Sequence, residues 1–254
     1  MVRGYTDCMM TNILFLEGPI QTGKSTLIRD VLGVHLAACG GFTSQRLIDS
    51  AGDTRGFRIG PAASTPLTAP LAGMRPGPAA VNPLLEDSAD YDAIPAFAAP
   101  NLLSTHLLTA PNGSIYPGVF KYFDPAGRVH TDQEVFDILG VQYLLPKRGC
   151  PLMLLDEIGG SELLRPLFRQ ALYNLLDSGI PCLGVLKLAD SARHMQKRSY
   201  TPDPESGKTI VDYNEELRAR IAEDPEGQVL YFERGTSSEA VVRERLQEFV
   251  RGIF

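Results

Sequence analysis

Eight residues near the start of this 254-residue chain, 18–25, constrain its fold more than any other stretch. They read Gly-Pro-Ile-Gln-Thr-Gly-Lys-Ser and fit the pattern G-x-x-x-x-G-K-[ST]. Two glycines at this spacing let the backbone form a concave loop whose N–H groups point inward at an anion. An apolar run of strand length, 12–17, precedes the loop, and apolar residues recur after it at helical spacing. Strand, loop and helix in this order predict a phosphate-binding loop.

Each part of this loop has a predicted task. The positive end of the following helix faces the same anion as the loop N–H groups. Lys24 is expected to reach the β- and γ-phosphates, and the Ser25 hydroxyl to bind a Mg²⁺ ion. The predicted nucleotide-binding residues are Gly18, Pro19, Ile20, Gln21, Thr22, Gly23, Lys24, Ser25 and Thr26.

A second run, 151–159, carries the other predicted part of the site. Four apolar residues precede Asp156 and Glu157, which is typical of a buried parallel strand whose carboxyl end opens onto a ligand crevice. Asp156 is the candidate Mg²⁺ ligand of the Walker B type. Glu157 is the candidate general base, because a carboxylate next to the metal site can orient and deprotonate the water that attacks the γ-phosphate.

Alternating strands and helices along the chain predict an α/β fold with a largely parallel, three-layer sheet. Strands are predicted at 12–17, 41–48, 56–59, 118–123, 151–159, 180–188 and 228–232. Helices are predicted from the loop to Gly40 and Gly41, after capping-box spacing at 131–134, from Pro166 to 177–179, and after capping-box spacing at 236–239.

The whole chain, 1–254, is expected to form one domain with two long excursions. Residues 61–117 are rich in Pro, Ala and Gly and are predicted to be an insertion without a regular helix or central strand. Residues 193–227 are predicted to be a lid-like connection at the mouth of the crevice. Arg193, Lys197 and Arg198 lie there as alternative candidates for an arginine-finger type of cation, or as a solvated basic loop.

Charge and cysteines exclude several classes of protein. A net charge of −6 argues against general nucleic-acid binding, and the absence of an apolar run of 18 residues argues against a membrane span. The four cysteines, Cys8, Cys39, Cys150 and Cys182, have no histidine at metal-ligand spacing, so free thiols are expected. Residues 1–11 are too short and polar for a signal peptide, which together with the thiols favours the cytoplasm.

Four motifs in order resemble a known family. They are the loop itself, Gly-Phe-Thr at 41–43, Gly-Phe-Arg-Ile at 56–59, and Asp-Glu-Ile-Gly at 156–159. The set is similar to the P-loop nucleoside-triphosphatases related to the cancer-related nucleoside-triphosphatase and its thermophile counterparts. This resemblance implies a RecA-like P-loop core, Mg²⁺ dependence, and hydrolysis of ATP, GTP and similar nucleotides. Two segments, 60–118 and 193–227, are longer than in that family, which leaves the native substrate open.

Three functions follow from these residues. The first is a nucleoside-triphosphatase in which Glu157 activates water; the second is a small-molecule kinase in which the same base serves an acceptor hydroxyl. The third is a nucleotide-dependent regulatory or adaptor protein with a protein partner. Residues 156–159 fit the D-x-x-G of GTPase switches, but the guanine-reading N-K-x-D is absent, since 187–190 lack the Asn and have the wrong spacing. A dedicated GTPase switch is therefore disfavoured.

Overall fold

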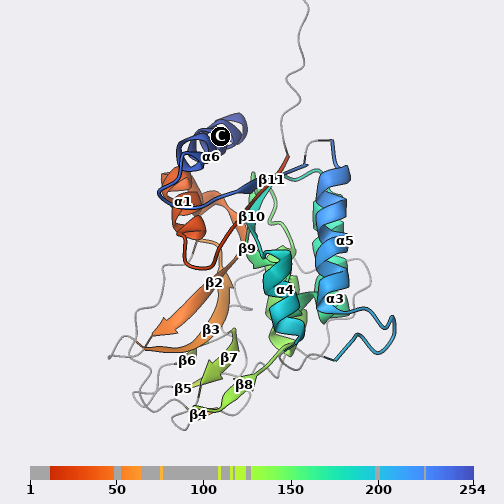
Figure 1. Cartoon of the computed structure of the whole chain (residues 1–254). Helices are drawn as coiled ribbons and strands as arrows, with labels where there is room; N and C mark the ends of the chain where they lie inside the picture. Colours follow the sequence, from red (N-terminus) through yellow and green to blue (C-terminus); the bar gives the residue numbers. More distant parts are fainter. Residues whose placement is uncertain are drawn as a thin grey trace, which may run out of the picture.

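A computed structural model describes residues 12–48, 53–63, 75–76, 108–109, 115–116, 118–123, 127–197, 201–225 and 227–254 of the chain (Figure 1). Its centre is an eight-stranded sheet in the order β11-β1-β10-β9-β2-β3-β7-β8. These strands are β1 Ile13–Glu17, β2 Gly40–Ile48, β3 Thr54–Pro61, β7 Val119–Phe123, β8 Val129–Thr131, β9 Met153–Ile158, β10 Cys182–Leu186 and β11 Gly227–Tyr231. Strands β11 to β2 are parallel, and β3, β7 and β8 extend the sheet in antiparallel fashion.

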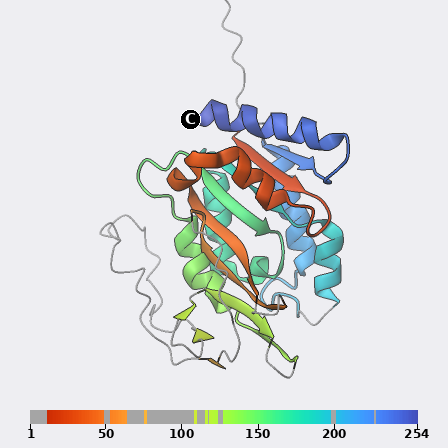
Figure 2. The ribbon, with the colours of Figure 1, turned by 90° about the vertical axis from the view of Figure 1, so that its left-hand side faces the viewer.

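Helices cover both faces of the sheet (Figure 1). They are α1 Lys24–Leu32, a 3-10 helix Gly33–Ala38, a π-helix Phe136–Gly140, α2 Val141–Leu144, a 3-10 helix Ser161–Leu164, α3 Pro166–Leu176, α4 Ala189–Gln196, α5 Ile210–Glu223 and α6 Ser238–Ile253. Helix α6 packs on α1 over one face (Figure 2), while α2, α3 and α5 cover the other.

Strand β1 packs against the helices on both faces of the sheet. Ile13 and Phe15 join the core beneath α3 and α5, whereas Leu14 and Leu16 join the core beneath α1 and α6. Side chains alternate across a strand, so a strand buried on both faces must be apolar at every position. The predicted three-layer α/β fold is thereby confirmed, and its parallel part is the P-loop type of core that the sequence predicted.

The order of the parallel strands determines which residues meet. Strand β10 lies between β1, which leads into the loop, and β9, which ends in the two acids. Because parallel strands end at the same edge of a sheet, the residues after β1, β10 and β9 come together there. The predicted strand at 56–59 is β3, and it is antiparallel to β2, so the Gly-Phe-Thr and Gly-Phe-Arg-Ile motifs lie on neighbouring strands.

The predicted end of the first helix at Gly40 and Gly41 is wrong. Helix α1 ends at Leu32 before Gly33, and the chain continues as a 3-10 helix, so Gly40 and Gly41 begin β2. Gly41 has φ +90°, and a Cβ there would lie 2.0 Å from the carbonyl oxygen of Leu154. The glycine signal therefore marks a close approach of β2 to β9 instead of a helix end.

The first predicted capping box does not form. Thr131 is the last residue of β8, and the Asp132 carboxylate accepts from the Glu134 N–H at 3.1 Å. A helix follows as predicted, with Val135, Phe136 and Leu139 buried, but its first full turn is a π-helix.

The second predicted capping box does not form either. Thr236 donates its hydroxyl hydrogen to the Glu233 carbonyl at 2.8 Å, while the Glu239 carboxylate accepts from the Gly235 N–H at 2.8 Å. Helix α6 begins at Ser238 with no side-chain cap on its N-cap residue Ser237. The helix itself was predicted, and its apolar face is buried against α1.

Sequence analysis missed two helices in the 193–227 connection. Helix α4 ends at Gln196 within it, and α5 fills its second half. Thr209 and Asp212 form a reciprocal capping box at the start of α5. The Pro-rich insertion at 61–117 lies mostly outside the described residues; within it are β4 Arg75–Pro76, β5 Leu108–Thr109 and β6 Ile115–Tyr116, which form a separate small sheet.

Cys39, Cys150 and Cys182 are free thiols, as predicted, and Cys8 lies outside the described residues. Burial raises the pKa of the Cys182 thiol to about 12, which keeps it protonated and unreactive. Across the described part of the chain, no helix combines the length and apolar character that crossing a membrane requires.

Candidate functional site

The phosphate loop between β1 and α1 has the backbone that its glycines predict. Gly18 and Gly23 have φ of +144° and +88°, and Gln21 between them has φ +65°, a conformation that costs a non-glycine residue about 1–2 kcal/mol. Strand β11 holds the start of the loop, because the Phe232 N–H donates to the Glu17 carbonyl at 2.8 Å. A Cβ on Gly18 would lie 2.0 Å from the Phe232 carbonyl oxygen, so only glycine fits this position.

Helix α1 begins at Lys24, directly after the loop. Its N-cap is Gly23, no side chain caps it, and its first turn contains no acidic residue. The first backbone N–H groups of a helix have no partner within the helix. They remain available to an anion in the loop, which the helix dipole also favours.

Lys24 lies folded over the loop. Its ammonium donates to the carbonyl of Gly18 at 2.9 Å, to that of Pro19, and to the Thr22 hydroxyl at 3.3 Å. Burial lowers the pKa of Lys24, while the charges of Glu157 and Asp156 act in the opposite direction. The loop carbonyls and the Thr22 hydroxyl thus hold the ammonium against the loop.

Ser25 and Asp156 connect the two predicted halves of the site. The Ser25 hydroxyl donates to Asp156 Oδ1 at 2.7 Å, although 131 positions separate the two residues. Asp156 is 5% exposed at the end of β9. Burial, with the charge of the adjacent Glu157, raises the pKa of Asp156 to about 7, and the bond from Ser25 partly offsets this rise.

Glu157 is exposed and has an unusual backbone. It is one of two non-glycine residues with positive φ in the described part of the chain, at +62°, the other being Gln21 in the phosphate loop. Such conformations cost about 1–3 kcal/mol and persist where surrounding contacts hold them. Both acids lie within β9, where its register with β10 shifts: Asp156 is buried beside Ser25, while the Glu157 side chain is exposed to solvent.

Of the three arginine-finger candidates, Arg193 is engaged in ion pairs away from the loop. Arg193 in α4 pairs with Asp190 at 2.6 Å and lies 3.9 Å from Glu215 of α5. Lys197 is exposed at the end of α4, and Arg198 lies outside the described residues. Arg193 is therefore committed to surface ion pairs between two helices.

Two other cations lie at the site and were missed from the sequence. Lys187 follows β10, and its ammonium donates to the Glu157 carbonyl and lies 3.7 Å from the Glu162 carboxylate. Arg234 follows β11, and its Nη1 lies 3.9 Å from where a Cβ on Gly23 would be. A cation directly after a central strand could have been predicted to lie at the site. The predicted strand 180–188 included Lys187, so its position after the strand was not recognised. No local pattern indicates Arg234.

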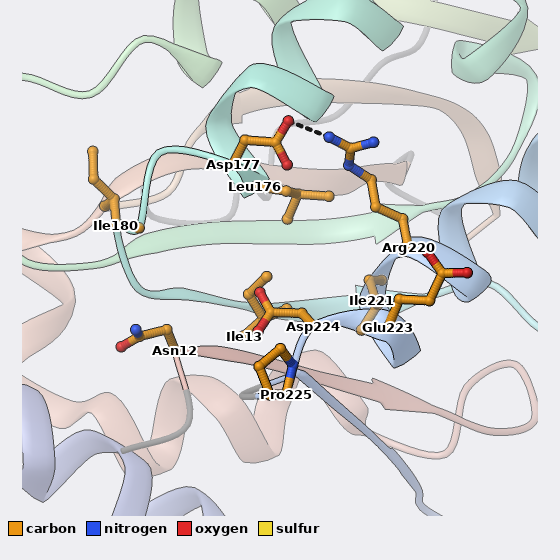
Figure 3. A pocket seen from close by; sticks show the side chains of 11 residues that line it. Asn12, Ile13, Leu176, Asp177, Ile180, Arg220, Ile221, Glu223, Asp224 and Pro225 are labelled. Carbon is orange, nitrogen blue, oxygen red and sulfur yellow. Dashed lines mark hydrogen bonds and ion pairs between the residues drawn. The ribbon is translucent and has the colours of Figure 1, made fainter. Parts of the chain in front are cut away.

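A pocket of about 490 Å³ lies elsewhere (Figure 3). Its lining includes Asn12 before β1, Ile180 before β10 and Pro225 before β11, so it opens at the amino ends of the parallel strands. Arg220 and Asp177 form an ion pair at its side (Figure 3). Ligands of open α/β sheets bind at the opposite edge, where the loop and the acids are.

Comparisons with known proteins bring up two solved structures. The match to the solution structure of a human cancer-related nucleoside triphosphatase covers 95% of this chain and 97% of the human chain, with 17% identity and a TM-score of 0.45. The match to the crystal structure of THEP1 from the hyperthermophile Aquifex aeolicus covers 94% of this chain and 98% of the THEP1 chain, with 14% identity and a TM-score of 0.47.

Both structures carry names from the group of proteins that the sequence motifs resemble. At these identities the likeness concerns the fold alone. No protein-family model matches the chain, and no curated protein matches it either.

Proposed function

We propose that this protein is a Mg²⁺-dependent nucleoside-triphosphatase that hydrolyses the γ-phosphate of ATP- or GTP-type nucleotides with a water activated by Glu157. The observation that carries the proposal is the 2.7 Å bond from Ser25 to Asp156. It brings the hydroxyl of the phosphate loop and the buried acid of β9 together, which is the pair that binds Mg²⁺ in P-loop proteins.

The donor set suits Mg²⁺. The ion prefers oxygen ligands and is commonly held by one or two protein groups together with water and substrate phosphates. Ser25 and Asp156 supply such oxygens, and the described residues contain no cluster of three or more His, Cys, Asp or Glu suited to another metal. A buried carboxylate is costly unless a cation compensates it, which also favours a metal beside Asp156. When bound, Mg²⁺ would neutralise charge on the β- and γ-phosphate oxygens.

The remaining residues bind the triphosphate and move a proton. The backbone N–H groups of Gly18 and of residues 20–26 surround the β-phosphate, since Pro19 has none to donate. Lys24 exchanges its weak carbonyl partners for charged phosphate oxygens. Glu157 accepts a proton from water while the water oxygen bonds to the γ-phosphorus. The bond from that phosphorus to the bridging oxygen breaks, giving a nucleoside diphosphate and phosphate.

Phosphate release from a panel of nucleotides, with and without Mg²⁺, tests this proposal. We expect Lys24→Ala to lose most nucleotide binding, since it removes the ammonium that meets the phosphates. Glu157→Gln should bind nucleotide like the parent chain but release phosphate at least ~100-fold more slowly, the range of a general base. Unchanged turnover in Glu157→Gln would reject Glu157 as the base. Transfer of the phosphoryl group to an added acceptor, with little free phosphate, would favour a kinase instead.

A further inference from the structure

One helix holds three strand ends of the candidate site together. Helix α5 lies against the sheet beside α3 (Figure 1), and Asn214 and Arg218 are one turn apart on it. Asn214 is fully buried, with 0% of its surface exposed. Together these two side chains contact residues that follow β9 and β10 and the last residue of β1.

The hydrogen bonds of Asn214 require an amide. Its Nδ2 donates to the Gly159 carbonyl at 2.8 Å and to the Lys187 carbonyl at 3.3 Å. Its Oδ1 accepts from Arg218 Nε at 2.9 Å. Arginine only donates and carbonyls only accept, so the orientation of the amide is determined by its partners. An aspartate could keep the bond to Arg218 but would lose both donations.

The donation to Gly159 acts just beyond Glu157, which is the next-to-last residue of β9. Gly159, two residues further on, has φ +99°, and a Cβ there would lie 2.6 Å from Asn214 Nδ2. Glu157 itself has φ +62°. Glycine adopts a positive φ freely, so the strain lies at Glu157, and Asn214 bonds the carbonyl two residues after it.

Arg218 extends the same contact to the phosphate loop. Its Nη1 lies 2.6 Å from the carboxylate of Glu17, the residue before Gly18, and its Nη2 donates to the Lys187 carbonyl at 2.7 Å. The side chains of Arg218 and Glu17 are 24% and 20% exposed, so solvent screens this ion pair less than a surface pair. The beginning of the loop and the end of β9 are thus held to one helix turn.

We propose that Asn214 is a positioning residue that acts through Glu157: it holds the end of β9, which contains the strained Glu157, so that the Glu157 carboxylate faces the phosphate loop. Arg218 orients the Asn214 amide and sets its distance from the loop. This inference rests on the proposed role of Glu157 in hydrolysis. Lys187, whose ammonium bonds the Glu157 carbonyl, contacts the same end of β9.

The test uses two variants of the full chain that remove the hydrogen bonds of Asn214 in different ways. Asn214→Asp keeps the size and the Arg218 contact but has no N–H to donate, and Asn214→Ala removes the group without adding charge. We expect each to lower the single-turnover rate of ATP hydrolysis about 30–100-fold with Mg²⁺ present, because a displacement of about 1 Å costs catalysis this much. ATP affinity should change less than about 3-fold, since the phosphate loop keeps its own contacts.

A double-mutant cycle separates positioning from general damage. In a Glu157→Gln background, either substitution at Asn214 should change the rate by less than about 2-fold, because the group it positions is already disabled. Arg220→Ala is the matched control: it removes an ion pair from the same helix at the opposite edge and should keep the parent rate. Thermal unfolding of every variant identifies those that are folded at the assay temperature, and either folded Asn214 variant suffices for the cycle.

The outcomes are distinguishable. Equal fold-losses in the parent and Glu157→Gln backgrounds, or folded Asn214 variants with the parent rate, would overturn the positioning role. A Glu157→Gln chain that hydrolyses ATP as fast as the parent would instead reject the proposed function of Glu157.

Discussion

Replacing Gly18 with alanine tests the contact between the phosphate loop and β11. A Cβ at this position would lie 2.0 Å from the Phe232 carbonyl oxygen. An ordinary contact needs about 3.5 Å, so the two backbones must separate by more than ~1 Å. The Phe232 N–H to Glu17 bond of 2.8 Å resists that separation. Gly18→Ala therefore combines an unfavourable φ with overpacking against backbone.

The magnitude follows from those two costs. A left-handed φ costs an L-residue about 1–2 kcal/mol, and overpacking adds about 1–3 kcal/mol. Gly179 provides a matched control, because its φ of +73° is also positive but nothing lies within 4 Å of its Cβ position. We expect Gly18→Ala to lower the free energy of unfolding by about 3 kcal/mol and Gly179→Ala by about 1 kcal/mol.

Urea unfolding without nucleotide measures both values, and nucleotide binding to the folded chains gives a second readout. Gly18→Ala should weaken binding at least ~10-fold, because the loop N–H groups are displaced, whereas Gly179→Ala should bind like the parent. Equal destabilisation by the two substitutions would show that β11 moves aside freely. The close approach would then contribute nothing to the loop.

Two further predictions concern charged groups. The Tyr213 hydroxyl donates to Asp203 at 2.5 Å and lowers the pKa of that carboxyl to about 2. Because the pKa of Asp203 is lower in the folded chain than in the unfolded chain, its carboxylate stabilises the fold at pH values above the unfolded pKa. This stabilisation is lost as the pH falls through the folded pKa. The loss of stability caused by Asp203→Asn should therefore be largest at pH 5–7 and roughly halved near pH 3. Urea titrations of both chains at pH 7 and 3 check this, and a constant difference would contradict it. Arg234 lies beside Gly23, and Arg234→Ala should weaken ATP binding about 3–10-fold by losing one charged phosphate contact. Equilibrium titration measures this against Arg251→Ala at the far end of α6, and equal affinities in the two variants would remove Arg234 from the site.

Local patterns in the sequence were sufficient for the loop, the five parallel strands and the pairing of Ser25 with Asp156, but not for the short edge strand β8. The glycine spacing constrains only eight residues, and the apolar runs at 12–17 and 151–159 need no distant information. The rule that parallel strands end at one edge then brought Ser25 and Asp156 together. The structure has these residues 2.7 Å apart.

The features that were missed or wrongly predicted from the sequence depend on distant contacts or on competing sequence patterns. Helix α5 has a capping box at Thr209 and buried residues Ile210, Tyr213, Leu217 and Ile221 at helical spacing, but the polar, proline-bearing stretch before it hid this pattern. Gly41 fits the pattern of a helix end as well as that of a close strand approach, and only the position of Leu154 decides between them. The φ of Glu157 is set by surrounding contacts, so no local pattern predicts it.

The placement of β1 has a consequence for how the protein is made. Its neighbours in the sheet are β10 and β11, so Ile13 pairs with Cys182 on one side and with Gly227 on the other. During synthesis the loop strand must wait for partners that leave the ribosome much later, and contacts so distant along the chain close slowly. A nascent chain therefore exposes an unpaired apolar strand until β10 has been synthesised. Until β11 arrives, the loop lacks one wall, so the proposed nucleotide binding requires a chain synthesised through β11.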